Sequence, residues 1–436
     1  MRILALTWKH PDDPSAGGAE RYLVEVARRW VDAGHEVTIL GPRRPPSVPE
    51  NSLGAWERIR YIGSGSRLTV FRSALAHLRN HGAVYDLVLE TVSTRPFLAH
   101  RVVGGKATAL YHQTAEEVWQ EEFPWPLALL GRYLLEPHWV RSMRGARVVA
   151  NSRSTADALR RFGVECIGVV PPGCDQPTTP AKAEGPSSPP RLLWIGRMVR
   201  TKRPEDALAA QSLIREHLPG ATLEMVGTGY LRARLAARDL PGVTFRGAVP
   251  ESQKRSLLAR SDLLLLPGTR EGWGIVAMEA AAHGVPVIAY DIPGLRDSVV
   301  DGVTGVLVSP KPEAMADAAR ALLSDPVRWR LLRVAARERA MEFTWERAAK
   351  DLLSRRAQAA VGLAEVRAAD SSAPATAPDG GAKFSMGGVA RLRPGPGPSS
   401  DVRPAIPMCR GCGKSERVHG SRSHATYGEA LTDRCP

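Results

Sequence analysis

The stretch RILALTWKHPDDPSAGGAERYLVEVARRWVDAGHEVTIL, residues 2–40, decides the fold class. It opens with an apolar, strand-like run at 2–8, passes through a glycine-containing loop, and closes with a second strand-like run at 36–40. Between the two runs, apolar residues recur at helical spacing from 22 to 31, and Gly34 marks the end of that helix. A strand, a helix and a strand in this order make a crossover connection, which joins parallel strands. The stretch therefore predicts an α/β fold with a parallel sheet.

The same alternation continues in two series, which a segment rich in Pro and Ser separates at 176–190. That segment is poor in apolar residues and predicts a linker. We expect two doubly wound, Rossmann-like domains that face each other across a cleft, with the active site in that cleft. The further strands are predicted at 85–90, 107–112, 146–152 and 167–173, then at 191–197, 221–229, 243–249, 262–268, 285–290 and 305–310. The helices of the second series are predicted at 204–217, 230–239, 251–260 and 275–283.

The predicted boundaries place a first domain at 1–175, a second at 191–342, a closing helix at 343–360 and a tail at 361–436. The tail is rich in Ala, Pro, Gly and Ser over much of its length, which predicts disorder. Its CRGCG motif raises the hypothesis of a zinc site. However, only one pair of candidate ligands has the Cys-x-x-Cys spacing of a zinc knuckle, and no apolar core surrounds the motif. We therefore prefer an incidental tail and assign no metal. The residues considered were Cys409, Cys412, His419, His424 and Cys435.

Charge and composition limit the class of partner. The chain of 436 residues has a formal net charge of +14. The positive excess is spread along the chain rather than concentrated in a stripe, which argues against nucleic acid. It fits anionic small substrates and, as a weaker inference, peripheral contact with an acidic membrane surface. The beginning of the sequence lacks the apolar core and cleavage site of a signal peptide, so we expect a cytoplasmic protein, peripheral at most to the inner face of the membrane.

The loop SAGGAER, residues 15–21, lies between the first predicted strand and the first predicted helix. Gly17 and Gly18 would let backbone N–H groups approach an anion at the start of the helix. The loop lacks the GxGxxG pattern of dinucleotide-binding proteins. Glycines that only shape a turn are an equally good interpretation of this motif alone.

A second candidate anion site is GRMVRTKRP, residues 196–204. Arg197 and Lys202 follow a predicted strand, and Pro204 is placed to begin the next helix. Two cations at the carboxyl end of a strand suit a diphosphate. A solvated basic turn is the alternative.

The third candidate is EGWGIVAME, residues 271–279, directly after a predicted strand. Gly272 and Gly274 predict a turn, and a helix is expected from about Ile275. The free N–H groups of Ile275 and Val276 would then point into the cleft, where they could bind phosphate oxygens.

The two carboxylates of this stretch, Glu271 and Glu279, cannot bind phosphate because like charges repel. A carboxylate accepts hydrogen bonds from the hydroxyls of a diol, so the pattern describes a ligand with a central diphosphate and a polyol at each end. A nucleotide sugar has this layout. The alternative, acids that only complement the helix dipole, explains an early acid but not the flanking glycines.

In the first domain, His112 ends a predicted strand and precedes a segment of acids and aromatic residues, 113–126. At that position a side chain would project into the cleft. A single histidine is more often structural than catalytic, so the residue pattern leaves both roles open.

Together these motifs resemble the retaining nucleotide-sugar glycosyltransferases of glycosyltransferase family 4, which have the GT-B fold. The resemblance covers about residues 1–358 and is strongest over 191–308, where WIGRMVRTKRP, MVGTG, EGWGIVAMEAAAHGVPVIA and VVDGVTGVLV occur in the family's order. It implies that the first domain binds the acceptor and the second binds the nucleotide sugar. The closing helix would cross back to the first domain.

The resemblance also implies a role for each matched position. Arg197 and Lys202 would neutralise the diphosphate, Glu271 would hold hydroxyls of the donor sugar, and Glu279 would bind the ribose. The amides after Gly272 and Gly274, those of Ile275 and Val276, would bind phosphate. The remaining matches are Val249 beside the base, Gly17 and Gly18 in the loop over the phosphates and acceptor, and His112 near the transferred sugar.

The implied reaction transfers a sugar from a nucleoside diphosphate to a hydroxyl of a saccharide or lipid-linked acceptor, as in cell-envelope polysaccharide biosynthesis, with retention of configuration. It needs no metal and no cofactor beyond the donor itself. Two alternatives stay open, a sugar-nucleotide epimerase of the same fold and a non-catalytic nucleotide-binding protein.

Overall fold

The computed structural model describes residues 1–44, 46, 58–177 and 185–354. The predictions for the tail, for its cysteines and histidines and for the last residues of the closing helix lie outside the described residues. So does the middle of the predicted linker, 178–184.

The first half of the chain folds around a sheet of seven strands in the order β3-β2-β1-β4-β5-β6-β7. Every neighbouring pair is parallel, and β1 pairs with β2 through Ile3 opposite Val37 and with β4 through Ile3 opposite Leu87. The strands are β1 (Arg2–Leu6), β2 (Glu36–Gly41), β3 (Arg60–Gly63), β4 (Leu87–Val92), β5 (Ala107–Tyr111), β6 (Val148–Ala150) and β7 (Cys166–Val169).

The second half folds around a sheet of six parallel strands in the order β10-β9-β8-β11-β12-β13. The strands are β8 (Arg191–Ile195), β9 (Thr222–Val226), β10 (Val243–Gly247), β11 (Leu263–Leu266), β12 (Val287–Tyr290) and β13 (Gly305–Val308). The fold class predicted from the sequence, two doubly wound parallel sheets, is confirmed.

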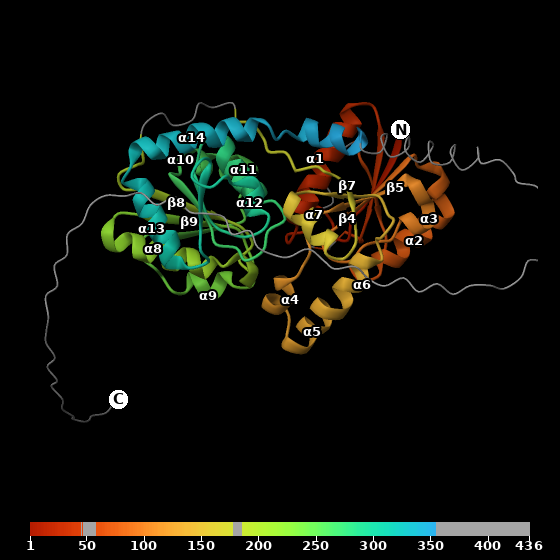
Figure 1. Cartoon of the computed structure of the whole chain (residues 1–436), viewed down its shortest axis with the longest axis horizontal. Coiled ribbons are helices and arrows are strands. Elements are labelled where there is room, and N and C mark those ends of the chain that lie inside the picture. The colour runs from red at the N-terminus through yellow and green to blue at the C-terminus, as the bar shows by residue number, and fades with distance from the viewer. Residues whose placement is uncertain (45, 47–57, 178–184, 355–436) are drawn as a thin grey trace, which may run out of the picture. The chain divides into compact units, whose positions relative to one another are not determined.

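Helices flank both sheets (Figure 1). Those of the first half are α1 (Gly18–Asp32), α2 (Val70–His81), the 3-10 turn η2 (Gly82–Val84), α3 (His100–Val103), the 3-10 turn η3 (Gly104–Lys106), α4 (Glu117–Glu122), α5 (Trp125–Leu130), the π-helix η4 (Gly131–Leu135), α6 (Glu136–Arg141) and α7 (Arg153–Arg160). Those of the second half are the 3-10 turn η5 (Arg200–Lys202), α8 (Pro204–His217), α9 (Arg232–Ala236), α10 (Glu251–Arg260), α11 (Ile275–Ala282), α12 (Leu295–Ser298), α13 (Pro312–Leu323) and α14 (Pro326–Met341). No helix among the described residues is long and apolar enough to cross a membrane.

Strand β1 shows why the sheet is covered on both faces. Its Ile3 and Ala5 belong to one buried cluster, which includes α1, whereas Leu4 and Leu6 belong to another, which includes α2. Successive side chains of a strand point to opposite faces, so a run that is apolar throughout must be buried on both sides. This explains why central strands such as β1 and β11 are continuous apolar runs rather than alternating ones.

The two sheets each have one position where the strand order reverses. In the first sheet it lies between β1 and β4, and in the second between β8 and β11. In open parallel sheets, ligands bind in the crevice outside the carboxyl ends of the strands at this position. The loops after β1, β4, β8 and β11 are therefore where the fold offers a binding site.

The chain returns to the first sheet after α14. Residues 345–354 are helical. Trp345, Ala348 and Leu352 from this segment lie in the buried cluster that contains Ile3 and α1. The Trp30 indole N–H donates to the carbonyl oxygen of Ala349 at 2.9 Å. The last described helix of the chain is thus packed on the first half, whereas α14 before it belongs to the second half.

The approach of this segment to Gly173 gives a test of the packing. A Cβ at Gly173 would lie 2.2 Å from the Trp345 nitrogen, whereas a Cβ at Gly105 would meet nothing within 4 Å. We expect Gly173→Ala to lower the free energy of unfolding by about 1–3 kcal/mol, because the backbone of 344–345 must move. Gly105→Ala is the matched control and should change it by less than about 0.5 kcal/mol. Equal urea midpoints for the two variants would contradict the packing.

Candidate active site

The loop after β11 and the start of α11 contact the first half of the chain directly. A Cβ on Gly272, in the loop after β11, would lie 2.0 Å from the carbonyl oxygen of His112, at the end of β5. A Cβ on Gly18, at the start of α1, would lie 3.2 Å from the Ile275 side chain of α11. Glycine is needed at 272 because the backbones of the two halves approach too closely for a side chain. The structure therefore brings four of the predicted site residues to one place.

Lys202 and Glu271 form an ion pair in which the Lys202 ammonium donates to the Glu271 carboxylate. Lys202 ends the turn η5 after β8, and Glu271 lies in the loop after β11, so adjacent strands present the two charges. The side chains are 25% and 26% exposed, which leaves them accessible to a ligand. The two predicted residues are thus neighbours in the structure, and their roles stay predictions.

Arg197, the other predicted cation, is exposed and forms no ion pair within the part of the chain that the structure describes. It lies near Lys9 in the loop after β1. Burial lowers the pKa of the Lys9 ammonium, and repulsion from Arg197 lowers it further, against the attraction of Glu20. Arg197 therefore faces the first half with its charge unneutralised.

The amino-terminal end of α11 is free of internal caps. Gly274 precedes the helix with a φ of 85°, a left-handed conformation that favours glycine, and no side chain caps it. The Gly274 carbonyl accepts from Ala277 N at 2.9 Å, while the amides of Ile275 and Val276 donate to no described residue. Both residues are half-buried. These two N–H groups are open at the start of the helix, and their predicted role in binding phosphate stays a prediction.

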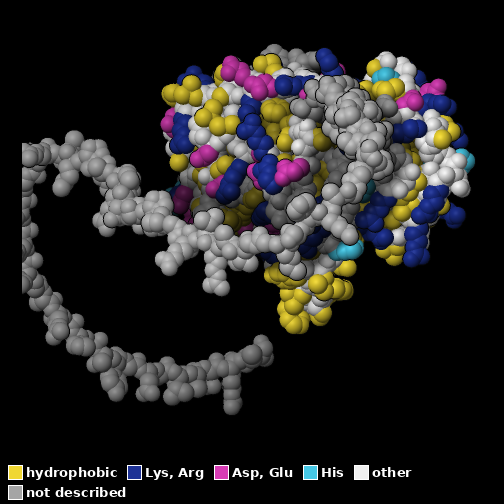
Figure 2. Space-filling view, turned by 45° about the vertical axis from the view of Figure 1, so that its right-hand side comes forward, with side chains coloured by type: hydrophobic (Ala, Val, Ile, Leu, Met, Phe, Trp, Pro, Cys, Tyr) yellow, Lys and Arg dark blue, Asp and Glu magenta, His cyan; other side chains and the backbone are white. Residues whose placement is uncertain are grey.

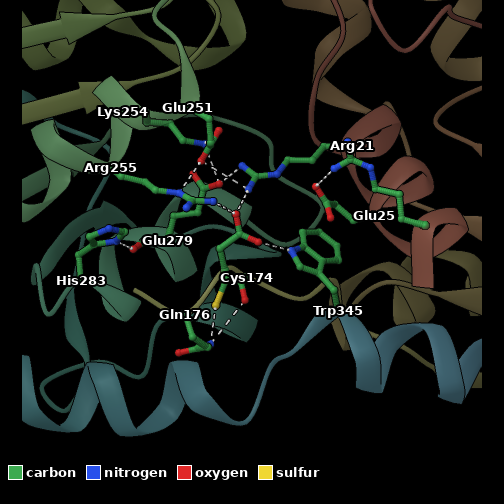
Figure 3. Close-up of polar contacts among 12 residues, drawn as sticks. Arg21, Glu25, Cys174, Gln176, Glu251, Lys254, Arg255, Glu279, His283 and Trp345 are labelled. Atoms are coloured by element: carbon green, nitrogen blue, oxygen red, sulfur yellow. Dashed lines mark hydrogen bonds and ion pairs between the residues drawn. The ribbon is translucent and has the colours of Figure 1, made fainter. Parts of the chain in front are cut away.

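Glu279, about one turn further along α11, is buried and lies between cations from both halves (Figure 3). Arg21 of α1 forms an ion pair with it, and the Lys254 ammonium of α10 donates to the same carboxylate oxygen at 2.8 Å. The second oxygen, Oε2, is buried and has no hydrogen-bond partner among the described residues. One acceptor atom of this carboxylate is thus unused.

Arg21 joins a wider cluster of charges. It lies 3.2 Å from Asp175, which also receives a hydrogen bond from the Trp345 indole at 3.1 Å (Figure 3). Burial opposes the charge on Arg21, but Glu279, Glu251 and Asp175 outweigh it and raise the pKa of the guanidinium. Arg21 is therefore a permanent cation that connects the first half to α11.

His112 is buried and uncharged. Burial lowers the pKa of its imidazole to about 3, and its Nε2 atom has no hydrogen-bond partner among the described residues. The ring lies edge-on to Tyr22, with centroids 5.7 Å apart. A neutral ring with an unused nitrogen can bond a hydroxyl, but it cannot supply positive charge at neutral pH.

Arg270, directly before Glu271, is buried and connects the two halves of the chain. It is not among the site residues predicted from the sequence. Its guanidinium donates to the carbonyl oxygen of Thr114 at 3.1 Å and lies 3.2 Å from carboxylate oxygens of Glu116 and Glu117. These partners follow His112 in the first half. Arg270 thereby fixes the loop that carries Glu271 to the loop that follows His112.

The two remaining predicted residues lie at the edges of this arrangement. Val249 is half-buried between β10 and α10, the helix that supplies Lys254. Gly17 precedes α1, and its N–H donates to the Glu20 carboxylate at 2.8 Å, so this amide is already used. The described structure therefore supports Gly18, rather than Gly17, as the residue of this loop that touches α11.

A cavity of about 550 Å³ lies in the first half at the carboxyl ends of β1, β2 and β3. Its charged lining includes Asp13, Arg43, Arg44 and Arg67. Burial would raise the pKa of Asp13, but hydrogen bonds from Ser15 and Arg67 lower it to about 2. The lining therefore has a net positive charge, which suits an anionic group.

Comparisons with known proteins define the class. Residues 16–176 match the family model "Glycosyltransferase Family 4", and residues 175–342 match "Glycosyl transferases group 1". The chain is 30% identical to a glycogen synthase of Mycobacterium tuberculosis, over 79% of this chain and 92% of the relative. It is 35% identical to a D-inositol 3-phosphate glycosyltransferase of Xylanimonas cellulosilytica, over 80% of this chain and 93% of the relative.

Among solved structures, Anabaena HepE in complex with UDP-glucose superposes with a TM-score of 0.60 at 18% identity, covering 84% of this chain and all of that chain. The fold and the matched families together define a glycosyltransferase with the GT-B fold. More particularly, the chain belongs to glycosyltransferase family 4.

The buried state of His112 predicts a specific pH dependence of stability. Below the ordinary pKa of 6.5 the unfolded chain binds a proton at His112, and the folded chain does so only near pH 3. The stability that the neutral ring contributes is thus complete above pH 6.5 and is lost as the pH falls toward 3. When the pH is lowered from 7 to 5, the free energy of unfolding should therefore fall by about 2 kcal/mol more in the wild type than in His112→Gln.

Chemical denaturation at both pH values measures this difference. The matched control is His138→Gln, at an exposed imidazole of α6. An identical loss of stability in the wild type and in His112→Gln would show that His112 is accessible to protons in the folded state.

Proposed function

We propose that this glycosyltransferase moves a sugar from a nucleoside-diphosphate sugar to an acceptor hydroxyl with retention of anomeric configuration. The observation that carries the proposal is the arrangement around α11. Two open N–H groups at its start lie between two carboxylates, Glu271 and Glu279, each of which is paired with a cation. Such a site offers hydrogen-bond donors to a diphosphate and acceptors to a polyol on either side.

In this proposal the diphosphate binds the amides of Ile275 and Val276 together with the side chains of Arg197 and Lys202. Lys202 is paired with Glu271 in the absence of a ligand. A bound diphosphate would draw the ammonium away, because two phosphate groups carry more negative charge than one carboxylate. Glu271 would then be free to accept hydrogen bonds from the hydroxyls of the donor sugar.

Glu279 binds the ribose in this proposal, and Val249 lies beside the base. The unused Oε2 of Glu279 supports this assignment, since a buried carboxylate oxygen without a partner is costly unless a ligand supplies one. Lys254 and Arg21 hold the other oxygen and so fix the orientation of the carboxylate.

The proposed chemical step takes place on one face of the sugar. The bond from the anomeric carbon to the diphosphate breaks, and its electron pair leaves with the phosphate oxygen. The acceptor oxygen forms the new bond on the same face, and its proton passes to a phosphate oxygen of the donor. Arg197, Lys202 and the helix amides stabilise the charge that develops on the leaving group. No metal ion is assigned a role.

His112 would act on the transferred sugar. Because its ring is uncharged, its proposed role is to bond a sugar hydroxyl and to occupy the floor of the site. The contact of its carbonyl group with Gly272 keeps this ring in register with the loop that carries Glu271.

The acceptor would enter from the first half. The cavity with Arg43, Arg44 and Arg67 supports an acceptor with an anionic group, such as a phosphate near the reacting hydroxyl. A saccharide of the cell envelope, free or lipid-linked, and a cytoplasmic donor pool fit this chemistry. The match to a D-inositol 3-phosphate glycosyltransferase supports the same class of acceptor.

A screen of UDP-, GDP- and ADP-sugars by thermal shift, followed by mass spectrometry with phosphorylated and unphosphorylated saccharide acceptors, tests the proposal. We expect one nucleotide class to stabilise the protein and a single sugar to be added to the acceptor. Proton NMR of the product should show the anomeric configuration of the donor. An isomerised nucleotide sugar without any acceptor would instead establish the epimerase, and binding without turnover a non-catalytic protein.

Substitution of the two key charges should separate binding from chemistry. Glu279→Ala should weaken donor binding about tenfold to hundredfold, because a charge-assisted bond to the ribose is lost. Lys202→Ala should lower kcat about hundredfold, with a smaller effect on KM, because it acts on the leaving group. Calorimetry and initial-rate kinetics measure these effects.

Neighbouring charges provide the controls. Glu251 contacts Arg21 and Lys254 but has no proposed donor contact, and Arg200 lies in the same turn as Lys202. Glu251→Ala should leave the donor affinity within about threefold, and Arg200→Ala should leave kcat within about threefold. A donor affinity unchanged by Glu279→Ala would remove the ribose assignment.

A further inference from the structure

A second surface of the first half has no part in the proposed donor or acceptor site. Residues 123–144, here called the apolar arm, follow α4 and form the consecutive helices α5, η4 and α6. Figure 1 shows α4 and α5 extending away from the sheet, and Figure 2 shows a dense group of apolar side chains on this protruding part of the molecule. The arm therefore presents an apolar surface to solvent.

The apolar arm exposes apolar side chains to solvent, whereas a surface helix of a soluble protein normally exposes polar ones. Its outward side chains are apolar, with Trp125 74%, Leu134 64% and Tyr133 61% exposed. Leu127 and Leu130 complete a row at helical spacing, and both are exposed. An exposed apolar group of this kind marks a surface that binds another body.

The base of the arm is firmly held, so the exposure is not a consequence of a loose helix. The Glu136 carboxylate is buried and accepts hydrogen bonds from the Glu116 N–H at 2.9 Å and from the Trp119 indole at 3.0 Å. Gly131 lies so close to the Trp119 ring that a Cβ there would be 2.1 Å away. The inner side of the arm is thus packed as a core, while its outer side has no cover among the described residues.

The exposed charges of the arm are positive. Glu136 is the only acidic residue between 123 and 144, and it is buried. Arg132, Arg141 and Arg144 lie on the same segment, and the latter two are exposed. An apolar tip followed by arginines complements a surface with an apolar interior and anionic headgroups.

The acids of the preceding helix α4 are turned toward the second half. Glu122 accepts a hydrogen bond from the Thr201 N–H at 2.9 Å, and Glu121 pairs with Arg203 at 3.2 Å. They therefore do not offset the positive charge of the arm where it faces outward. The same contacts fix the base of the arm to the turn that carries Lys202.

We propose that the apolar arm docks on an anionic lipid bilayer, with Trp125 and Leu127 at the boundary between headgroups and acyl chains. Trp and Tyr prefer this boundary, and exposed arginines beside them bind lipid phosphates. The arm lies in the surface of the bilayer rather than crossing it, because none of its helices is long enough to span one. The proposal does not depend on which sugar or acceptor the enzyme uses.

Vesicle flotation of the full chain tests the proposal. We expect the wild type to float with phosphatidylcholine vesicles that contain about 30% phosphatidylglycerol, to do so less in high salt, and to float weakly with phosphatidylcholine alone. The double variant Trp125→Glu, Leu130→Glu should reduce binding to the anionic vesicles about tenfold or more. Arg141→Glu should reduce the preference for anionic over neutral vesicles.

The matched control replaces exposed apolar residues of another basic helix, Leu331→Glu with Val334→Glu on α14, and should float like the wild type. Unchanged circular dichroism and thermal melting show that each variant is folded. Failure of the wild type to bind the anionic vesicles would overturn the proposal, as would equal loss in the arm and control variants. Light scattering distinguishes the other occupant, a second copy of the chain. If the wild type is a dimer, does not bind vesicles, and becomes a monomer in the arm variant, the arm is a dimer interface instead.

Discussion

The buried carboxylate of Glu279 is the constraint on which the arrangement of the site depends. A charge removed from water is tolerated only when it is paired and hydrogen-bonded, and the two cations that serve it come from different elements. Lys254 belongs to α10 of the second half, and Arg21 belongs to α1 of the first half. The helix that would hold the donor is therefore tied to the domain that would hold the acceptor, and removal of both cations would leave an uncompensated buried charge.

The same principle explains why a strongly basic protein has acids at an anion-binding turn. Glu271 and Glu279 both have cation partners without a ligand, so neither is an isolated negative charge beside the phosphate site. When Lys202 moves from a carboxylate to a phosphate, the exchange replaces one ion pair with another and costs little desolvation. Glu271 then gains hydroxyl donors in place of the ammonium. The acid pair thus provides both the resting partner of Lys202 and the acceptors for the sugar.

Local signals predicted most of the fold and part of the site. The apolar runs of β1 and β11, the helical spacing of α1 and the glycines before α11 depend on neighbours in sequence, and each is where the sequence placed it. The predicted helix at 230–239 was too long, since α9 covers Arg232–Ala236, and the short edge strand β3 was missed. The pairing of Arg21 with Glu279 joins residues 258 positions apart, and only the folded chain reveals it. Arg270 could have been suspected from its place beside Glu271, but its partners near Thr114 could not.

The segment from His112 to the apolar arm connects three features that the sequence presents separately. His112 contacts the Gly272 loop, Glu116 and Glu117 hold Arg270, and Glu122 accepts from the turn that carries Lys202. Only then does the chain reach the exposed side chains of the arm. A bilayer that orients the arm would therefore act on a segment already bonded to both donor-site loops. These contacts join the arm directly to the segments that carry Lys202 and Glu271, without a flexible linker between them. The position of the arm would thus let an enzyme at a membrane surface keep its cleft in a defined orientation to lipid-linked acceptors.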